Sequence, residues 1–530
     1  MREETDEARA DALEQEEVFA FLADPATHGL QGEVGRVDTH GAALFLAGPD
    51  VYKAKRAVRF PFMDFSTLEK RRAACEAEIA FNRPNAPQLY LGVVPVTRMN
   101  GRLRLGGDGE VVEWTAHLAR FDEDAGLDRI AARGELDPPL ARRLGETIAR
   151  AHHAAPVRRE SGAVDRLRRV IEEMADGLVA ASDHFGAKAA HDYGEDLRAA
   201  FSRVAPLLSR REARGRVRRC HGDLHLANIV LINGEPTLFD ALEFDETLAT
   251  IDVLYDLAFA LMDLWTRGLP QQANALMNAC LSAGDDMEGD IEGLAALPLF
   301  MSLRAAIRAR VATLEPDPKI ETLRSALALF EAARAFLAPC GARLVAVGGL
   351  SGTGKTRLGA AIAHAIGATP GAVHLRSDVE RKRLHGAREL DRLPPEAYGP
   401  EQSARVYARL MSLASIALRA GRGVVVDAAF LKERERTDAQ ALDRSAQFDG
   451  LWLEAPLAER LTRVARRRDD ASDATEEVAR AQETYVEDAT SWTRLDAGEP
   501  PQIVARRALE ILSNDQPTQA VPPPVGRGEA

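Results

Sequence analysis

Cysteine is scarce in this chain, with four residues among 530 and no paired spacing. Cys75, Cys220, Cys280 and Cys340 lie far apart, which predicts neither a disulfide framework nor a zinc site and favours a reducing cytoplasm. Long apolar runs are also missing, because none approaches the roughly 20 residues that cross a bilayer. Residues 1–7 are acidic, unlike a secretory signal. We therefore expect a cytoplasmic protein that needs no membrane.

Positive charge is in deficit, since 81 acidic residues outnumber 68 basic ones and give a net charge of −13. A general nucleic-acid binder would carry a basic surface, so we expect no nucleic-acid partner. The rest of the composition, 46% hydrophobic and 28% charged, is that of an ordinary globular protein. A chain of 530 residues is too long for one core, and we expect about two to four domains.

Residues 1–338 change from strand-like to helical patterns. Short apolar runs predict antiparallel strands over residues 15–60. Ser66-Thr67-Leu68-Glu69 matches a capping box, which predicts a helix from Ser66 to about Asn82. The order of elements predicts an α+β, bilobal, kinase-like domain. The other expected elements are a hairpin at Asn100-Gly101, helices over 138–215, a hairpin at Asn233-Gly234 and helices over 251–338.

Residues 339–515 instead alternate strands with helices, which predicts an α/β P-loop NTPase domain with a parallel sheet. The boundary is expected near Pro339-Cys340-Gly341. Residues 516–530 are rich in proline and glycine and predict a disordered tail. The expected strands are 343–349, 373–376, 424–427 and 447–453.

A complete Walker A motif follows the first of these strands. Its glycines allow consecutive backbone N–H groups to turn toward a phosphate. Lys355 is expected to reach the β- and γ-phosphates and the Thr356 hydroxyl to bind Mg²⁺, while the following helix adds its dipole. The motif therefore predicts ATP and Mg²⁺ as cofactors. Its residues are Gly349, Leu350, Ser351, Gly352, Thr353, Gly354, Lys355 and Thr356.

Three further features favour a kinase over a generic ATPase. Asp378 follows a strand at the edge where ligands bind, so it is a candidate acceptor of a substrate hydroxyl proton, and Arg381 is a candidate for holding an anionic group. Asp427 ends a buried strand at a Walker B-like position. Arginines crowd residues 460–468, where Arg463 and Arg467 share a helical face and are candidates for neutralising transition-state charge. A helix cap, a strand-end carboxylate and a solvated helix face are the alternatives.

These motifs resemble those of the small P-loop kinases related to zeta toxins, gluconate kinases and polynucleotide kinases. The resemblance covers residues 344–492. In that family the aspartate of the Ser-Asp-x-x-Arg element contacts the acceptor, which the resemblance carries over to Asp378 and Arg381.

A second phosphotransfer motif lies upstream, at His221-Gly222-Asp223. Asp223 is expected to act as the base or to orient the acceptor hydroxyl, and Asn228, five residues on, to bind Mg²⁺. Asp240 follows the intervening hairpin, where kinases place another metal-binding aspartate. A polar surface loop is the alternative.

The nucleotide lysine of this motif is expected on the strand that holds both Lys53 and Lys55, which share a face. Its glutamate partner is expected on the helix that starts at Ser66. Helical spacing leaves Glu76 and Glu78 both open, because they flank the apolar stripe on opposite sides.

Residues 19–338 resemble the aminoglycoside phosphotransferase-like kinases. The full chain is similar to bacterial two-domain proteins that join such a kinase domain to a P-loop ATP-binding domain. The resemblance favours Lys53 and Glu78, and it implies that Asp256 braces the catalytic loop; a first-turn helix carboxylate is the alternative. The chain departs from protein kinases in lacking a glycine-rich loop at residues 39–44. The motifs that carry the resemblance are Tyr52-Lys53, Cys75-Glu76-Ala77-Glu78, Tyr90-Leu91-Gly92-Val93, His221-Gly222-Asp223-Leu224-His225, Phe239-Asp240-Ala241-Leu242-Glu243-Phe244 and Ile251-Asp252-x-x-x-Asp256.

We therefore expect a bifunctional ATP-dependent phosphotransferase. Each domain would transfer the γ-phosphoryl group of ATP to a hydroxyl of a small-molecule acceptor. The alternative is one catalytic kinase domain, with the other acting as a nucleotide- or ligand-binding regulatory module. The acceptor and the oligomeric state stay open.

Overall fold

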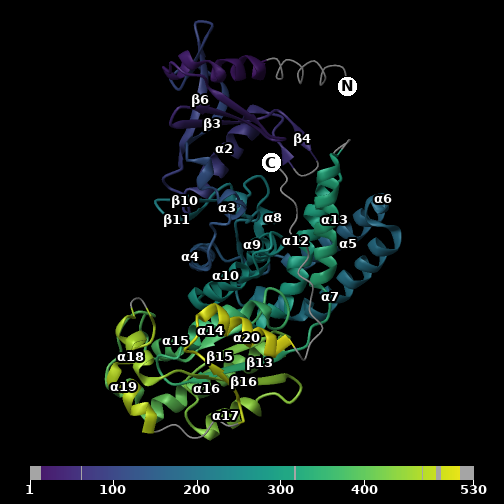
Figure 1. Cartoon of the computed structure of the whole chain (residues 1–530). Helices are drawn as coiled ribbons and strands as arrows, with labels where there is room; N and C mark the ends of the chain where they lie inside the picture. Colours follow the sequence, from purple (N-terminus) through teal and green to yellow (C-terminus); the bar gives the residue numbers. More distant parts are fainter. Residues whose placement is uncertain (1–13, 61–62, 315–317, 468–469, 485–490, 514–530) are drawn as a thin grey trace. The chain divides into compact units, whose positions relative to one another are not determined.

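Two compact units make up the chain. The first comprises Met1–Leu136, Ala154–Ser161 and Gly215–Asp256, and the second comprises the remainder. The second unit thus holds both the helices of the expected kinase domain and the P-loop region. The computed structural model describes residues 14–60, 63–314, 318–467, 470–484 and 491–513 (Figure 1).

An antiparallel sheet dominates the first unit. Helix α2 (Leu68–Asn82) packs on strands β8 and β6 of this sheet. The Asn100-Gly101 hairpin is confirmed: both residues have positive φ, and they join β6 to β7. The strand order is β1 (Gly35–Asp38), β2 (Ala42–Ala47), β3 (Asp50–Lys55), β8 (Glu110–Ala119), β6 (Tyr90–Met99) and β7 (Arg102–Leu105).

Two sequence predictions are wrong in this unit. Residues 14–23 form a helix and not a strand, because Val18, Phe19 and Leu22 recur at helical spacing and pack into the core on Phe45 of β2. Helix α2 is capped by Thr67, whose hydroxyl accepts from the Lys70 N–H. Ser66 does not start the helix, since its hydroxyl donates to Asp64 instead.

The rest of the first unit carries the motif around Asp223. The predicted hairpin is confirmed, because β10 pairs antiparallel with β11 around Asn233 and Gly234, both at positive φ. Strand β9, just before the Asp223 motif, pairs antiparallel with β12, which follows the hairpin. The bounds are β4 (Arg59–Phe60), β5 (Met63–Asp64), α3 (Leu127–Ala132), β9 (Val217–Arg219), β10 (Ile229–Ile232), β11 (Glu235–Leu238), α8 (Glu246–Ala249) and β12 (Thr250–Asp252), with short 3-10 turns at Pro25–His28, Glu123–Ala125 and Leu226–Asn228.

Helices form the other part of the kinase-like region, as predicted. Within the second unit, α12 packs on α13 and α5 on α7. The Tyr193 hydroxyl lies 2.9 Å from Ser302 Oγ, which donates to Ala333 O (2.7 Å), so buried polar groups join three helices. The helices are α4 (Pro138–Ala154), α5 (Ala163–Ala180), α6 (Ser182–Phe185), α7 (Ala187–Ala213), α9 (Val253–Thr266), α10 (Pro270–Ala283), α11 (Met287–Gly293), α12 (Leu297–Val311) and α13 (Ile320–Phe336), with a 3-10 turn at Leu294–Ala296.

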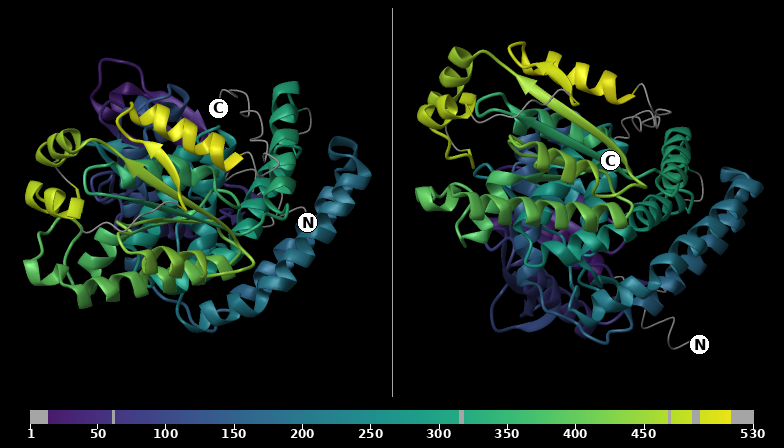
Figure 2. Two further views of the ribbon diagram at one scale, coloured as in Figure 1. Left: turned by 60° about the horizontal axis from the view of Figure 1, so that its bottom comes forward. Right: turned by 90° about the horizontal axis from the view of Figure 1, so that it is seen from below.

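A parallel five-stranded sheet forms the P-loop region, as predicted (Figures 1 and 2). Its order is β14 (Val373–Arg376), β15 (Val424–Asp427), β13 (Arg343–Gly349), β16 (Gln447–Glu454) and β17 (Thr493–Asp496). The sequence prediction missed β17, whose residues are mostly exposed. Helices α14 (Lys355–Ile362) and α20 (Pro501–Ser513) pack together beside the sheet, and α16 (Pro400–Arg419) covers β13, β14 and β15. The remaining elements are α15 (Ser377–Leu384), α17 (Glu433–Gln440), α18 (Leu457–Ala465) and α19 (Glu476–Ala481), with 3-10 turns at Ala363–Ala365, Pro395–Tyr398 and Gln482–Thr484.

Strand β14 lies at an edge of this sheet, where side chains of α10 satisfy its backbone. The His374 N–H donates to Asn278 Oδ1 (2.7 Å), and Asn278 Nδ2 donates to Ala372 O (3.0 Å). Asn274 adds a bond to Ala372 O (3.0 Å). An unpaired strand edge invites association with other chains, and here two asparagines occupy it. Within the described ranges, no helix combines the length and apolar character that a membrane crossing requires.

Candidate active sites

Buried ion pairs bring Lys53 and Glu78 together in the first unit. Lys53 Nζ lies 2.8 Å from Glu78 Oε1 and 2.8 Å from Asp240 Oδ1. Glu78 is fully buried, whereas Glu76 is exposed and pairs with Arg72 on the helix surface. Of the two glutamates that helical spacing left open, the structure therefore places Glu78 at the site.

Lys55 has a second role that the sequence did not predict. Its Nζ lies 2.7 Å from Glu78 Oε2 and 2.5 Å from Glu243 Oε1. Lys53 and Lys55 therefore bind one glutamate through both of its oxygens, and Glu243 ties the segment after Asp240 to the sheet. The signal was present in the sequence as two lysines at strand spacing on one face.

The groups in this network hold one another in their charged forms. Burial alone would lower the pKa of Lys53, but Asp240 and Glu78 raise it well above its ordinary value. Burial would raise the pKa of Glu78, yet Lys53 and Lys55 hold it below its usual range. Lys53 likewise lowers the pKa of Asp240.

Hydrogen bonds from its backbone N–H groups to the Asp256 carboxylate hold the catalytic-loop motif in place. The Gly222 N–H donates to Asp256 Oδ1 (2.8 Å) and the His221 N–H to Asp256 Oδ2 (3.3 Å), so Asp256 braces the loop from the first turn of α9. Asp256 is therefore both a brace of the loop and a first-turn carboxylate of α9, the two interpretations that the sequence allowed. His221 Nε2 lies 2.9 Å from Phe239 O, a hydrogen bond that orients the ring.

Asp223 and Asn228 are brought together in this loop. Asn228 Nδ2 donates to Asp223 O (2.9 Å) and to Asp223 Oδ2 (3.0 Å). This leaves the Asn228 amide oxygen for another ligand. Asp240 lies close enough for Asp223 to act on its pKa, and its side chain is 44% exposed. Amide and carboxylate oxygens are the ligands Mg²⁺ prefers, so Asn228 and Asp240 fit a metal ion.

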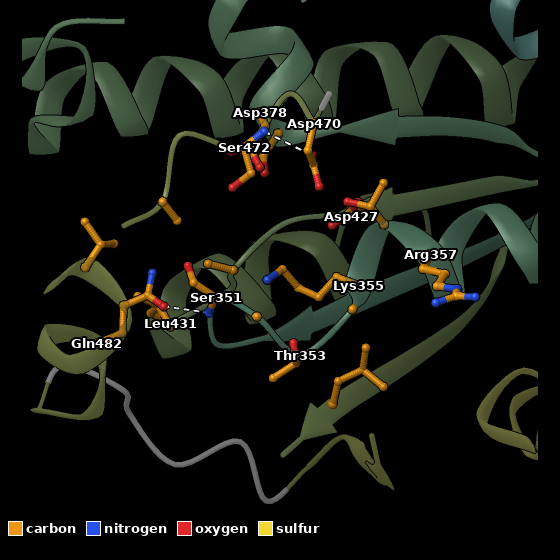
Figure 3. A pocket seen from close by; sticks show the side chains of 18 of the residues that line it. Ser351, Thr353, Lys355, Arg357, Asp378, Asp427, Leu431, Asp470, Ser472 and Gln482 are labelled. Carbon is orange, nitrogen blue, oxygen red and sulfur yellow. Dashed lines mark hydrogen bonds between the residues drawn. The ribbon is translucent and has the colours of Figure 1, made fainter. Parts of the chain in front are cut away.

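The Walker A residues surround a cavity of about 860 Å³ in the second unit (Figure 3). Strand β13 ends at Gly349 and α14 begins at Lys355, so the loop lies between a buried strand and a helix N-terminus. Gly352 has a φ of +91°, and a Cβ there would lie 2.7 Å from Arg460 O. The backbone fits closely only because this residue is glycine, as expected of a phosphate-binding loop.

Lys355, Thr356 and Asp427 meet at the floor of this cavity. Lys355 Nζ donates to Leu350 O (3.1 Å), and the Thr356 hydroxyl donates to Asp427 Oδ2 (2.5 Å). In Figure 3, Lys355 projects into the space between Ser351 and the carboxylates of Asp378 and Asp427. The hydroxyl and the carboxylate fit a hydrated Mg²⁺, and Lys355 fits the terminal phosphates.

Burial shifts the pKa values of these groups toward neutrality. It lowers the pKa of Lys355. It raises the pKa of Asp378, with a further contribution from Asp427, and it also raises the pKa of Asp427. The charged forms of Lys355, Asp378 and Asp427 therefore stabilise one another less than the charged groups around Lys53 do.

The three predicted arginines also line the cavity, each anchored by a backbone or acidic group. Arg381 Nη1 donates to Ala397 O (2.7 Å), and its guanidinium lies 4.8 Å from the Tyr398 ring centre. Arg463 donates to Ala497 O (2.7 Å). Arg467 lies 3.8 Å from Asp470. Of the other clustered arginines, Arg460 is buried and donates to Ser351 O, Arg466 is exposed, and Arg468 lies outside the described residues.

Polar residues after the arginine cluster close the cavity, and the sequence prediction gave them no role. Gln482 Oε1 accepts from the Ser351 N–H (2.7 Å). Asp473 accepts from Lys382 Nζ (2.8 Å) and from the Tyr398 hydroxyl (2.5 Å). The signal for Asp473 was the run of acidic residues that follows the arginines.

Both parts of the chain match known protein families. Residues 60–289 match the model of the phosphotransferase enzyme family, and residues 344–489 match that of an AAA domain. The chain therefore joins a kinase-like domain of the aminoglycoside phosphotransferase type to a P-loop kinase-like domain, as the sequence resemblance predicted. The match of the first part is to a phosphotransferase family, and kinases of that kind use ATP and usually Mg²⁺.

Two mycobacterial proteins match nearly the whole length of this chain. Uncharacterized proteins of Mycobacterium tuberculosis (strain ATCC 25618 / H37Rv) and Mycobacterium bovis (strain ATCC BAA-935 / AF2122/97) are each 28% identical over 506 residues, which are 89% of this chain and 94% of theirs. A choline/ethanolamine kinase family protein of Mesorhizobium loti is 15% identical, covering 61% of this chain and 95% of its own (TM-score 0.38). A sugar kinase of Janibacter sp. HTCC2649 is 21% identical, covering 32% of this chain and 94% of its own (TM-score 0.25).

Proposed function

We propose that the chain is a bifunctional ATP-dependent phosphotransferase, in which each domain transfers the γ-phosphoryl group of ATP to a hydroxyl of a small-molecule acceptor. The observation that carries the proposal is two separate clusters of groups that fit phosphates and a metal ion. Lys53, Glu78 and Asp240 meet in one set, and Lys355, Thr356 and Asp427 meet in the other. A domain that only bound ligands would need neither set complete.

In the first domain, Lys53 holds the α- and β-phosphates while Glu78 keeps it in place. Asn228 and Asp240 would hold Mg²⁺, which would supply positive charge to offset that of the phosphates. Asp223 orients the acceptor hydroxyl and takes its proton. The two hydrogen bonds from Asn228 to Asp223 support this division of roles, because they fix the base beside the metal ligand.

In the second domain, the Walker A backbone and Lys355 hold the phosphates, and Thr356 and Asp427 hold the hydrated Mg²⁺. Asp378 takes the acceptor proton, since its raised pKa makes it a better base than an exposed aspartate. Arg463 and Arg467 offset transition-state charge. The buried Arg381 Nε has no hydrogen-bond partner among the described residues, which suits an anionic group on this domain's acceptor.

Two variants, alone and combined, test the proposal. We expect Asp223→Asn to remove one set of phosphorylated products from a metabolite library and Lys355→Ala to remove a different set, each by a factor of at least about 100. The double variant should lose both. Asp108→Asn and Lys188→Ala are matched controls on exposed side chains.

The same variants separate the proposal from its alternative. If Asp223→Asn leaves every acceptor-dependent product unchanged, the first domain is not a kinase and is better described as a regulatory module. If Lys355→Ala leaves ATP affinity and turnover unchanged, the assignment of the second site is wrong.

A further inference from the structure

Asp240 has a backbone conformation that its side chain makes costly. Its φ is +57°, in the left-handed region that few residues other than glycine adopt. Aspartate adopts this region more readily than most residues other than glycine, and the conformation persists where surrounding groups determine it. The residue is also the proposed metal ligand, so whatever fixes its backbone also sets the position of the carboxylate.

Side chains from outside the segment bind the backbone of Asp240 and Ala241. The Tyr90 hydroxyl accepts from the Asp240 N–H (2.9 Å), and Asn82 Oδ1 accepts from the Ala241 N–H (2.7 Å). Asn82 Nδ2 lies 3.5 Å from Ala241 O, so the amide meets both polar groups of one residue.

The catalytic loop binds the residues on either side. His221 Nε2 lies 2.9 Å from Phe239 O, and the Leu242 N–H donates to His221 O (2.9 Å). The backbone from Phe239 to Leu242 is therefore held at each residue. Among these contacts, Tyr90 binds the backbone of Asp240 itself, and Asn82 binds the backbone of its neighbour Ala241.

Asn82 stands four residues after Glu78 on α2, so the two side chains share one face of the helix. Asn82 Nδ2 also donates to Glu78 O (3.0 Å). Asn82 is 1% exposed and Tyr90 2%, so water does not compete for their bonds to the segment. One helix face thus fixes Lys53 through Glu78 and the Asp240 segment through Asn82.

We propose that Asn82 and Tyr90 are positioning residues that hold the Asp240 carboxylate at the metal site of the first domain. The inference rests on the proposed function and deepens it, because it names what sets the metal requirement of that site. Both side chains bond to backbone N–H groups of the Asp240 segment. Their loss should therefore weaken metal-dependent binding and leave metal-free nucleotide binding alone.

The test uses the full-length Lys355→Ala chain, in which the second nucleotide site is disabled. Calorimetric titration with ADP at several Mg²⁺ concentrations gives the Mg²⁺ concentration for half-maximal nucleotide affinity. We expect Asn82→Ala to raise it about tenfold and Tyr90→Phe about threefold, because a ligand freed from its fixed position loses preorganisation. Affinity for ADP without metal should not change. Asn85→Ala, on the exposed surface three residues away, should change neither quantity.

The outcomes are distinct. If the Lys355→Ala parent binds no Mg·ADP, the proposed function of the first domain fails and the inference falls with it. If the parent binds but both variants keep its Mg²⁺ requirement, the inference is overturned while the proposed function stands; a lowered melting temperature with an unchanged Mg²⁺ requirement has the same meaning. Tyr90→Phe keeps the buried ring, so it decides the matter if Asn82→Ala does not fold.

Discussion

The two phosphate-binding sites of this chain handle buried charge in opposite ways. Around Lys53, two lysines and three carboxylates pair with one another at 2.5 to 2.8 Å. Around Lys355, the lysine meets a backbone carbonyl at 3.1 Å and Asp427 meets a hydroxyl. The pKa values follow, since pairing favours the charged forms at the first site and burial favours the neutral forms at the second.

Because of this difference, we expect substitutions at the two sites to have different effects on folding stability and on ligand binding. At the first site the same contacts that prepare the groups for ligand also hold the sheet, α2 and the Asp240 segment together. At the second site the backbone of a glycine-rich loop shapes the phosphate site. The charged side chains around Lys355 are compensated only when a ligand binds. A substitution at the first site should therefore cost folding stability as well as binding, whereas one at the second should cost mainly binding.

The largest expected effect comes from removing each lysine in turn. Lys53→Met removes one of the two lysines that pair with the fully buried Glu78, and breaking a buried pair in this way costs about 3 kcal/mol of unfolding free energy. It also removes the lysine that pairs with the half-exposed Asp240. Lys355→Met removes a half-buried cation whose charged form is already disfavoured, so unfolding free energy should change by less than about 1 kcal/mol. Denaturant unfolding followed by circular dichroism, with nucleotide titration alongside, measures both quantities.

Lys188→Met is the matched control, because that side chain is 87% exposed. Equal destabilisation by Lys53→Met and Lys355→Met would break the comparison between the sites. A chain that lost nucleotide binding at the first site with no loss of stability would also contradict it.

Acidification should affect the second site before the first. Glu78 and Asp240 have folded-state pKa values below their unfolded ones, so the stability they contribute is present above the unfolded pKa and is lost only as pH falls through the lower, folded value. Asp378 and Asp427 have raised pKa values, so they take up protons at a higher pH and folding is favoured when they do.

Profiles of kcat/KM against pH test this order, because they report groups of the free enzyme. The Asp223→Asn chain isolates the second domain and the Lys355→Ala chain the first. We expect the acid limb of the second domain's profile to lie at the higher pH. Coincident acid limbs would mean that the difference in pairing has no functional consequence.

Much of the fold could be predicted because the local patterns were strong. Strands 373–376 and 424–427 have the predicted bounds. The second is a continuous apolar run that ends at a polar residue, which is typical of a buried parallel strand. The helix over residues 14–23 was predicted wrongly because its apolar residues form one short run, 18–23, that resembles the strand-like sequence after it. Strand β17 was missed because an exposed edge strand carries little hydrophobic signal.

At the sites, residue types could be predicted but the choice between neighbours needed the fold. Glu76 and Glu78 are equivalent by helical spacing, and only the position of β3 distinguishes them. Lys55 looked like a spare lysine until Glu243, 188 residues later, was found beside it. Asn82 and Tyr90 act through backbone groups, so the sequence did not predict their role, although Tyr90 stands in one of the motifs that carry the resemblance.

Alanine at one glycine of each site gives the smallest effect and sharpens the comparison further. Gly222 and Gly352 both have positive φ, +86° and +91°, so alanine costs about 1 kcal/mol at either position. A Cβ on Gly222 would lie 3.1 Å from the side chains of Leu242 and Ala249, whereas one on Gly352 would lie 2.7 Å from the backbone oxygen of Arg460. Side chains yield by a few tenths of an ångström more readily than backbone. Nucleotide affinity should therefore fall further for Gly352→Ala than for Gly222→Ala in parallel titrations, and the reverse order would show that the second site does not depend on its backbone as the comparison requires.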